Sequence, residues 1–111
     1  MTATRLDKIQ AMLKDDPQDT FLRYSLALEQ EKIGKFDASD TGLRELMAET
    51  PPYVPAFFML AQQLVRRDAG LVNDARTALR AGIETARQQG NDHAAGEMSE
   101  FLASLGEQHG E

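Results

Sequence analysis

The sequence predicts an all-α protein, a helical-repeat array of about six antiparallel helices that forms an α-α superhelix. Three observations lead to this fold class. Apolar residues recur at helical spacing along most of the 111 residues. The alternating runs and Asn-Gly or Asp-Gly pairs typical of β-hairpins are absent from the sequence. The pattern also repeats with a period near 34 residues, which is typical of helical solenoids. A chain of this length is expected to form a single domain, residues 1–111.

The first helix is expected within residues 4–16. Its apolar stripe consists of Leu6, Ile9, Met12 and Leu13. Proline disfavours helical geometry at the residue before it, so Pro17 predicts that this helix stops at Asp16. The same two residues predict the start of the second helix, with Asp16 as its N-cap and Pro17 in its first position.

Five further helices are expected, each ended by a glycine, a proline or an exposed polar segment. Gly34 suits the end of the second helix, and Pro51 and Pro52 end the third. Asn91 is expected to cap the sixth helix. The predicted ranges are 18–33, 36–49, 53–67, 71–89 and 91–105, followed by a tail that is expected to fray.

Two copies of one pattern follow each other along the chain. Pro17 and Pro51 lie 34 residues apart, and at this offset Tyr24 corresponds to Phe58. Further matches place Leu26 and Ala27 on Leu60 and Ala61 and, at an offset of 36, Ser39 on Ala75, Leu43 on Leu79 and Met47 on Ile83. The pattern predicts a half repeat (1–16), repeat one (17–50), repeat two (51–89), a C-terminal capping helix (90–106) and a frayed tail (107–111).

Both first helices of these repeats carry two apolar stripes. The core stripe of the second helix is Leu22, Leu26, Ala27 and Ile33, and that of the fourth is Phe57, Leu60, Ala61 and Leu64. The second stripe lies roughly 100° away. Such a stripe is either buried by flanking helices or by an identical chain, or it is kept free for a partner. Its members are Phe21, Tyr24 and Leu28 on the second helix, and Phe58, Gln62 and Val65 on the fourth.

These repeats resemble tetratricopeptide repeats over about residues 17–86. The residues that carry the resemblance are Leu26, Ala27, Gly34, Phe36, Ser39, Leu43 and Pro51 in the first copy, and Phe57, Leu60, Ala61, Leu64, Ala75, Leu79 and Gly82 in the second. Arg23, Gln30, Leu46 and Asp68 depart from the pattern of that family.

The resemblance implies a concave groove that holds a peptide or helix of a partner protein. By the resemblance, the residues that line or border this groove are Phe21, Tyr24, Leu28, Phe58, Gln62, Val65 and Arg66. Some members of the family clamp a terminal carboxylate with Lys and Asn, which the matching positions here lack. The expected function is therefore a non-catalytic adaptor for an apolar or amphipathic segment, without a cofactor.

Two other functions fit the same sequence. A homodimerising structural module would use the same face against a second copy. Nucleic-acid binding would use Arg76, Arg80 and Arg87, which share one face of the fifth helix. The net charge of −6 makes nucleic acid a poor expectation.

No pattern in the sequence predicts an enzyme, a metal site or a membrane span. Cysteine is absent, and the histidines are His93 and His109. A calcium-like loop from Asp37 has Ala48 where the bidentate glutamate belongs, and His93 with Glu97 would supply only two ligands. Neither a signal peptide nor an apolar run of about 20 residues is visible, so a cytoplasmic protein is expected.

Overall fold

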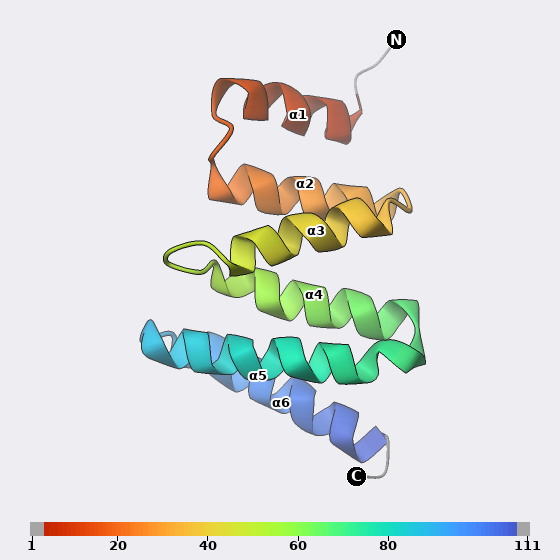
Figure 1. Cartoon of the computed structure of the whole chain (residues 1–111), viewed down its shortest axis with the longest axis vertical. Helices are drawn as coiled ribbons and strands as arrows, with labels where there is room; N and C mark the ends of the chain where they lie inside the picture. Colours follow the sequence, from red (N-terminus) through yellow and green to blue (C-terminus); the bar gives the residue numbers. More distant parts are fainter. Residues whose placement is uncertain (1–3, 109–111) are drawn as a thin grey trace. The chain divides into compact units, whose positions relative to one another are not determined.

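The structure, a computed structural model, describes residues 4–108, apart from the side chains of residues 107 and 108. Within these residues the chain is all-α, and no strand occurs. The predicted fold class, an all-α array of helices, is confirmed (Figure 1). The helices are α1 (Arg5–Asp15), α2 (Thr20–Lys32), α3 (Phe36–Met47), α4 (Val54–Arg67), the short 3-10 helix η1 (Ala69–Leu71), α5 (Val72–Gln88) and α6 (Asp92–Gln108).

The contacts between residues divide the chain into two compact units. Unit 1 is Met1–Tyr53 and holds α1, α2 and α3, whereas unit 2 is Val54–Glu111 and holds α4, η1, α5 and α6. The boundary follows Pro51 and Pro52, close to the predicted border between the two repeats. The single domain over residues 1–111 stays a prediction.

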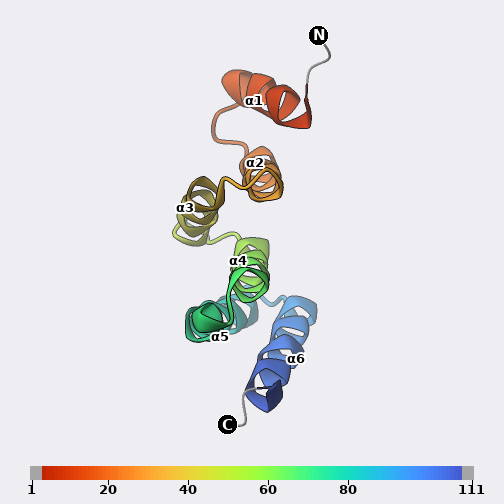
Figure 2. The ribbon, with the colours of Figure 1, turned by 90° about the vertical axis from the view of Figure 1, so that its right-hand side faces the viewer.

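In unit 1 the chain reverses its direction at each connection, so α1, α2 and α3 are consecutively antiparallel (Figure 1). Figure 2, which looks along α2 and α3, shows these two helices side by side. Ser39 on α3 is fully buried, and its hydroxyl donates to the carbonyl of Ala27 on α2 at 2.6 Å. Gly42 lies on the same side of α3, where an added Cβ would be 3.7 Å from the Cβ of Ala27. Small residues therefore let these two helices approach closely.

The start of α2 differs from the prediction. Asp16 is the C-cap of α1, and its N–H bonds to the carbonyl of Met12 at 3.1 Å. The N-cap of α2 is Asp19, whose carboxylate accepts from the N–H of Leu22 at 2.8 Å, and the helix begins at Thr20. The prediction of Asp16 as cap and Pro17 as first helical residue was wrong, because a second acid three residues later supplies a better-placed acceptor.

At the end of α2, the prediction for Gly34 is confirmed and the prediction for Ile33 is wrong. Gly34 adopts φ +84°, a left-handed conformation that favours glycine and stops the helix. Ile33, expected in the core stripe, is 53% exposed. It is the C-cap residue, where the backbone has already left the helical path, so its side chain no longer follows the stripe.

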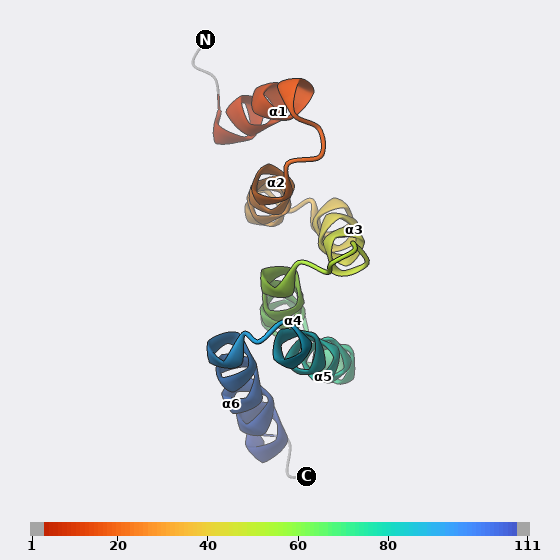
Figure 3. The same ribbon diagram turned by 90° about the vertical axis from the view of Figure 1, so that its left-hand side faces the viewer.

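In unit 2, α4 packs against α5, and α6 packs against α5 and touches α4, as Figure 3 shows from one side. The predicted core stripe of α4 is buried: Phe57, Leu60, Ala61 and Leu64. Gly82 on α5 sits where the three helices converge, because an added Cβ would come within 2.6 Å of both the Met98 sulfur and the Phe57 Cβ.

Helix α6 is longer than expected. Asn91 accepts from the N–H of Ala94 at 3.1 Å, which confirms the predicted cap. The helix continues past Leu105 to Gln108, so the predicted end was wrong. Gly106 does not stop it, because its φ is not positive and no left-handed turn forms there. The rest of the expected frayed tail, residues 109–111, lies outside the described residues. In the described part of the chain, no helix is both long and apolar enough to cross a membrane.

Candidate protein-binding surface

The seven predicted groove residues fall into two sets, one in each unit. Phe21, Tyr24 and Leu28 lie on α2 in unit 1. The other four lie on α4 in unit 2: Phe58, Gln62, Val65 and Arg66. The structure brings the members of each set together on one helix, and a groove continuous over both repeats stays a prediction.

Phe21 is the most exposed of the large apolar side chains in the described chain, at 65%. Tyr24 and Leu28, three and seven residues later on the same helix, are half-buried. We call these three residues the α2 face. Burying a phenylalanine side chain is worth about 1.5 to 3 kcal/mol, and Phe21 does not gain most of this free energy within unit 1. An exposed Phe beside a half-buried Tyr and Leu is therefore a candidate contact for another molecule.

The ring of Tyr24 contacts that of Tyr53, which the sequence did not single out. The two rings meet edge to face, with centroids 5.4 Å apart and planes at 65°. Tyr53 was expected in the fourth helix, but that helix starts at Val54, and the N–H of Tyr53 bonds to the carbonyl of Leu46 in unit 1. The one available signal was its position between the prolines and the first helical residue of repeat two.

Both tyrosine hydroxyls lie in surroundings that disfavour their charged form. Burial, followed by the neighbouring Tyr53, raises the pKa of Tyr24 above its usual value. Burial, followed by the carboxylate of Asp19, raises the pKa of Tyr53. The pair is therefore neutral at physiological pH and presents an amphipathic rather than a charged surface.

Exposed apolar side chains are concentrated in unit 1. The large apolar residues with high exposure in the described chain are Met12 at 48%, Phe21 at 65%, Ile33 at 53% and Phe36 at 40%. All four belong to residues before the boundary at Tyr53, and unit 2 has no such residue among those described. The exposed apolar surface of the described chain is therefore mainly on unit 1.

On α4 the predicted residues are partly covered by α6. The rings of Phe58 and Phe101 have centroids 5.6 Å apart, and Phe58 is half-buried. Gln62 and Val65 are also half-buried, and Arg66 is exposed. The sequence analysis did not predict this role for Phe101, because it assigned the sixth helix only as a C-terminal capping helix. An aromatic residue in such a helix was a signal that this residue packs against a neighbouring helix.

The predicted arginine face on α5 is not a uniform surface of free cations. Arg76 is buried, and its guanidinium donates to the side-chain oxygen of Asn73 at 2.7 Å and to the carbonyl of Leu105 at 3.3 Å. Arg80 and Arg87 are exposed. The first arginine therefore ties α5 to the end of α6, which weakens the nucleic-acid interpretation.

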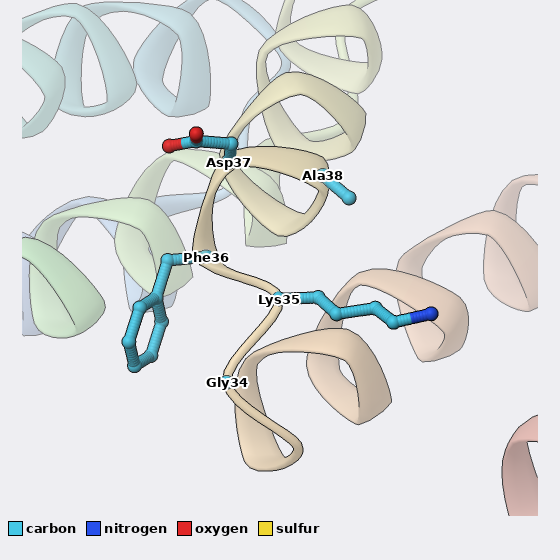
Figure 4. Close-up of a pocket in the computed structure, with 5 residues that line it drawn as sticks. All are labelled: Gly34, Lys35, Phe36, Asp37 and Ala38. Carbon is cyan, nitrogen blue, oxygen red and sulfur yellow. The ribbon is translucent and has the colours of Figure 1, made fainter.

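Figure 4 shows a surface pocket of about 320 Å³ at the turn between α2 and α3. Five consecutive residues line it, from Gly34 to Ala38, and the side chains of Lys35 and Phe36 point to opposite sides. These five residues do not place a nucleophile next to a base.

Metal ligands do not converge in the part of the chain that the structure describes. Among residues 4–106, whose side chains the structure describes, no three His, Cys, Asp or Glu are placed to bind one ion. His93 and Glu97 lie 3.5 Å apart on α6 as an exposed pair. His109 lies outside the described residues.

Comparison of this chain with protein-family models, with curated proteins and with solved structures gives no match in any of the three.

Proposed function

We propose that this chain is a non-catalytic protein-interaction module, similar in plan to a short tetratricopeptide array, which binds an apolar or amphipathic segment of another protein. The observation that carries the proposal is the exposure of Phe21, at 65%, on the same stripe of α2 as Tyr24 and Leu28. Burial of an aromatic anchor of this kind often dominates the energy of a protein interface. A cytoplasmic setting is part of the proposal.

The environment of Tyr24 supports the same role. Its ring is braced by Tyr53 at 5.4 Å, so less side-chain freedom is lost when a partner packs on it. Its hydroxyl remains neutral, which avoids the cost of desolvating a charge at the interface. A braced tyrosine next to an exposed phenylalanine therefore offers apolar area together with one polar handle.

In unit 2 we propose a second contact surface around Phe58, Gln62, Val65 and Arg66. Phe101 joins it, since its ring contacts that of Phe58 at 5.6 Å. Arg66 is exposed and suits an acid at the rim of such a surface. This surface is expected to contribute less than the α2 face, because Phe58 is half-buried and its ring already contacts Phe101 of α6.

A defined ligand can be obtained by selecting 16-residue peptides from a random phage-displayed library against the whole chain. Calorimetry then compares the selected peptide on the natural chain and on the Phe21→Ala and Tyr24→Ala variants. We expect each change to weaken binding by about tenfold or more, as is usual for aromatic anchors.

Phe36→Ala is the matched control, because it removes an exposed phenylalanine of unit 1 that belongs to α3 and not to the α2 face. It should change the affinity less than about twofold. Circular dichroism confirms that each variant is folded. Unchanged binding by both Phe21→Ala and Tyr24→Ala would exclude the α2 face as the site.

A further inference from the structure

Helix α1 is held to the rest of unit 1 by few side chains. It packs against α2 and, of the described helices, against no other to a comparable extent. Ile9 is its one buried residue, at 3% exposure. An ion pair joins Arg5 to Glu29 of α2 at 3.2 Å, but the Arg5 side chain is 67% exposed, and an ion pair so exposed contributes little to stability. Separating α1 from α2 therefore removes only a small part of the apolar burial in unit 1.

Helices α2 and α3 are joined to each other more firmly. Helix α3 buries Ser39, Leu43 and Leu46, and the Ser39 hydroxyl donates to the carbonyl of Ala27 on α2 at 2.6 Å. The linker between α1 and α2, residues 16–19, is short and mostly exposed, so a separated α1 remains close to α2. An isolated helix of 11 residues is only marginally stable in water, so a separated α1 also loses helical hydrogen bonds.

The packed position of α1 places Met12 at the same end of α2 as Phe21. Met12 follows Arg5 by two helical turns, so both residues lie on the same edge of α1, and the ion pair with Glu29 shows that this edge adjoins α2. Because α1 and α2 are antiparallel, Met12 is level with the first turn of α2, which carries Phe21 (Figure 1). Phe21 is also within about 80° of Glu29 around α2. Met12 is 48% exposed and Phe21 is 65% exposed, so each offers apolar surface to a partner.

We propose that α1 is a strap, which opens and closes on α2 while α2 and α3 stay packed, and that its closed position completes the surface on which a partner binds. With the strap closed, the bound segment contacts Met12 as well as Phe21. With the strap open, Met12 is withdrawn, and the side of α2 that α1 covers is exposed to water. A partner that contacts both helices binds the closed state more tightly and shifts the population toward it. This inference rests on the proposed function, because it concerns the affinity of the same face.

Amide hydrogen exchange of the free chain, read by mass spectrometry, tests the opening. The amides of α1 should exchange about tenfold or more faster than those of α2 and α3, because α1 opens without them. A saturating amount of the selected 16-residue peptide should slow the exchange of α1. One common rate for α1, α2 and α3, or an exchange of α1 that the peptide leaves unchanged, would overturn the proposal.

The strap can be fixed in its closed position because the chain contains no cysteine. In Arg5→Cys/Glu29→Cys, a short bismaleimide joins the two thiols at the place of the ion pair. The same variant with both thiols blocked by N-ethylmaleimide is the matched control. Cross-linking should slow the exchange of α1 by about tenfold or more relative to this control.

Ile9→Ala shifts the strap toward its open position. Because Ile9 is buried, its side chain is not part of the surface that a peptide contacts. The variant should bind the selected peptide about fivefold or more weakly in calorimetry, since the apparent affinity falls with the fraction of closed chain.

Cross-linking separates the position of α1 from the loss of the Ile9 side chain. In Ile9→Ala/Arg5→Cys/Glu29→Cys, the cross-link should restore the affinity for the peptide to within about twofold of that of the cross-linked chain with Ile9 intact. Far-UV circular dichroism shows that the other helices are retained. A cross-linked variant that binds as weakly as its blocked control would overturn the proposal.

Met12→Ala tests the contact on the strap itself. It should weaken binding of the peptide by about threefold or more, because the change removes apolar area from the closed surface. Gln10→Ala is the matched control: Gln10 is exposed on α1 and lies roughly 160° from Met12 around the helix, so its loss should change the affinity less than about twofold. Equal affinities for the Met12→Ala and Gln10→Ala variants would exclude Met12 from the surface.

The same calorimetric measurements separate this inference from the proposed function. Peptide binding that depends on Phe21 but ignores Ile9, Met12 and the cross-link would leave the proposed function intact and overturn the strap. Peptide binding that ignores both Phe21 and Tyr24 would overturn the proposed function, and with it the role of the strap in binding.

Discussion

At the scale of single residues, Tyr24 and Tyr53 are the most informative pair. They are 29 positions apart in the sequence, yet their rings lie 5.4 Å apart in the structure. Each is partly buried, and each has a raised pKa. Because they are the only tyrosines in a chain without tryptophan, their absorbance and fluorescence report on unit 1 without interference.

Spectrophotometric titration at 295 nm should therefore detect two phenols that ionise above the usual value near 10. In denaturant the midpoint should fall back to about 10. Since the folded pKa lies above the unfolded one, the contribution to stability is fully present below pH 10 and is lost as pH rises through the folded pKa.

Tyr53→Phe supplies the control for this titration. It leaves Tyr24 as the single titrating phenol and removes one of the two causes of its shift, so the remaining midpoint should lie closer to 10 than in the natural chain. Native and denatured titration curves that coincide would contradict the buried environment of both rings.

At the scale of helices, two glycines show how position decides the role of the same residue. Gly82 lies where α4, α5 and α6 converge, and an added Cβ would come within 2.6 Å of Phe57 and Met98. Gly96 lies in α6 with nothing within 4 Å of an added Cβ. The first glycine is required by packing, and the second only weakens its helix.

Gly82→Ala should destabilise the chain by about 1 to 3 kcal/mol, because the Phe57 Cβ cannot move without shifting α4. Gly96→Ala should stabilise it by about 0.5 to 1 kcal/mol through helix propensity. Urea unfolding followed by far-UV circular dichroism measures both free energies. Shifts of the same sign in the two variants would contradict the described convergence of helices.

At the scale of the whole molecule, the two units differ in the apolar area they bury. The buried apolar residues of unit 1 are Ile9, Ala27, Leu43 and Leu46, whereas unit 2 buries more apolar residues, on each of its three α-helices, such as Phe57, Leu60, Leu79 and Met98. All the strongly exposed large apolar residues described belong to unit 1. The unit proposed to make the main contact with a partner is thus the one with the smaller core.

Amide hydrogen exchange read by mass spectrometry should show this difference. We expect α4 and α5 to exchange most slowly and α1 fastest, because local opening is easiest where few apolar contacts are lost. Peptide bound at the α2 face should slow exchange in α1 and α2 and leave α5 unchanged. Equal protection across both units would mean that they open together.

The sequence by itself determined the helices and much of the core. Helical periodicity depends on neighbours three and four residues apart, so Phe57, Leu60, Ala61 and Leu64 could be assigned to the core in advance. The left-handed Gly34 and the Asn91 cap were also predictable, because their signals lie within one helical turn. At the start of α2, Asp16 was predicted as the N-cap, but the N-cap is Asp19, so this prediction was wrong.

The tertiary structure alone decided which surface residues have partners. It placed Tyr53 against Tyr24, Phe101 against Phe58, and the guanidinium of Arg76 on the carbonyl of Leu105. These contacts join residues 29 to 43 positions apart, and their existence depends on how helices cross, which periodicity within one helix does not specify. Periodicity could place Phe21 on a second apolar stripe, but only the packing of unit 1 showed that its side chain is left exposed.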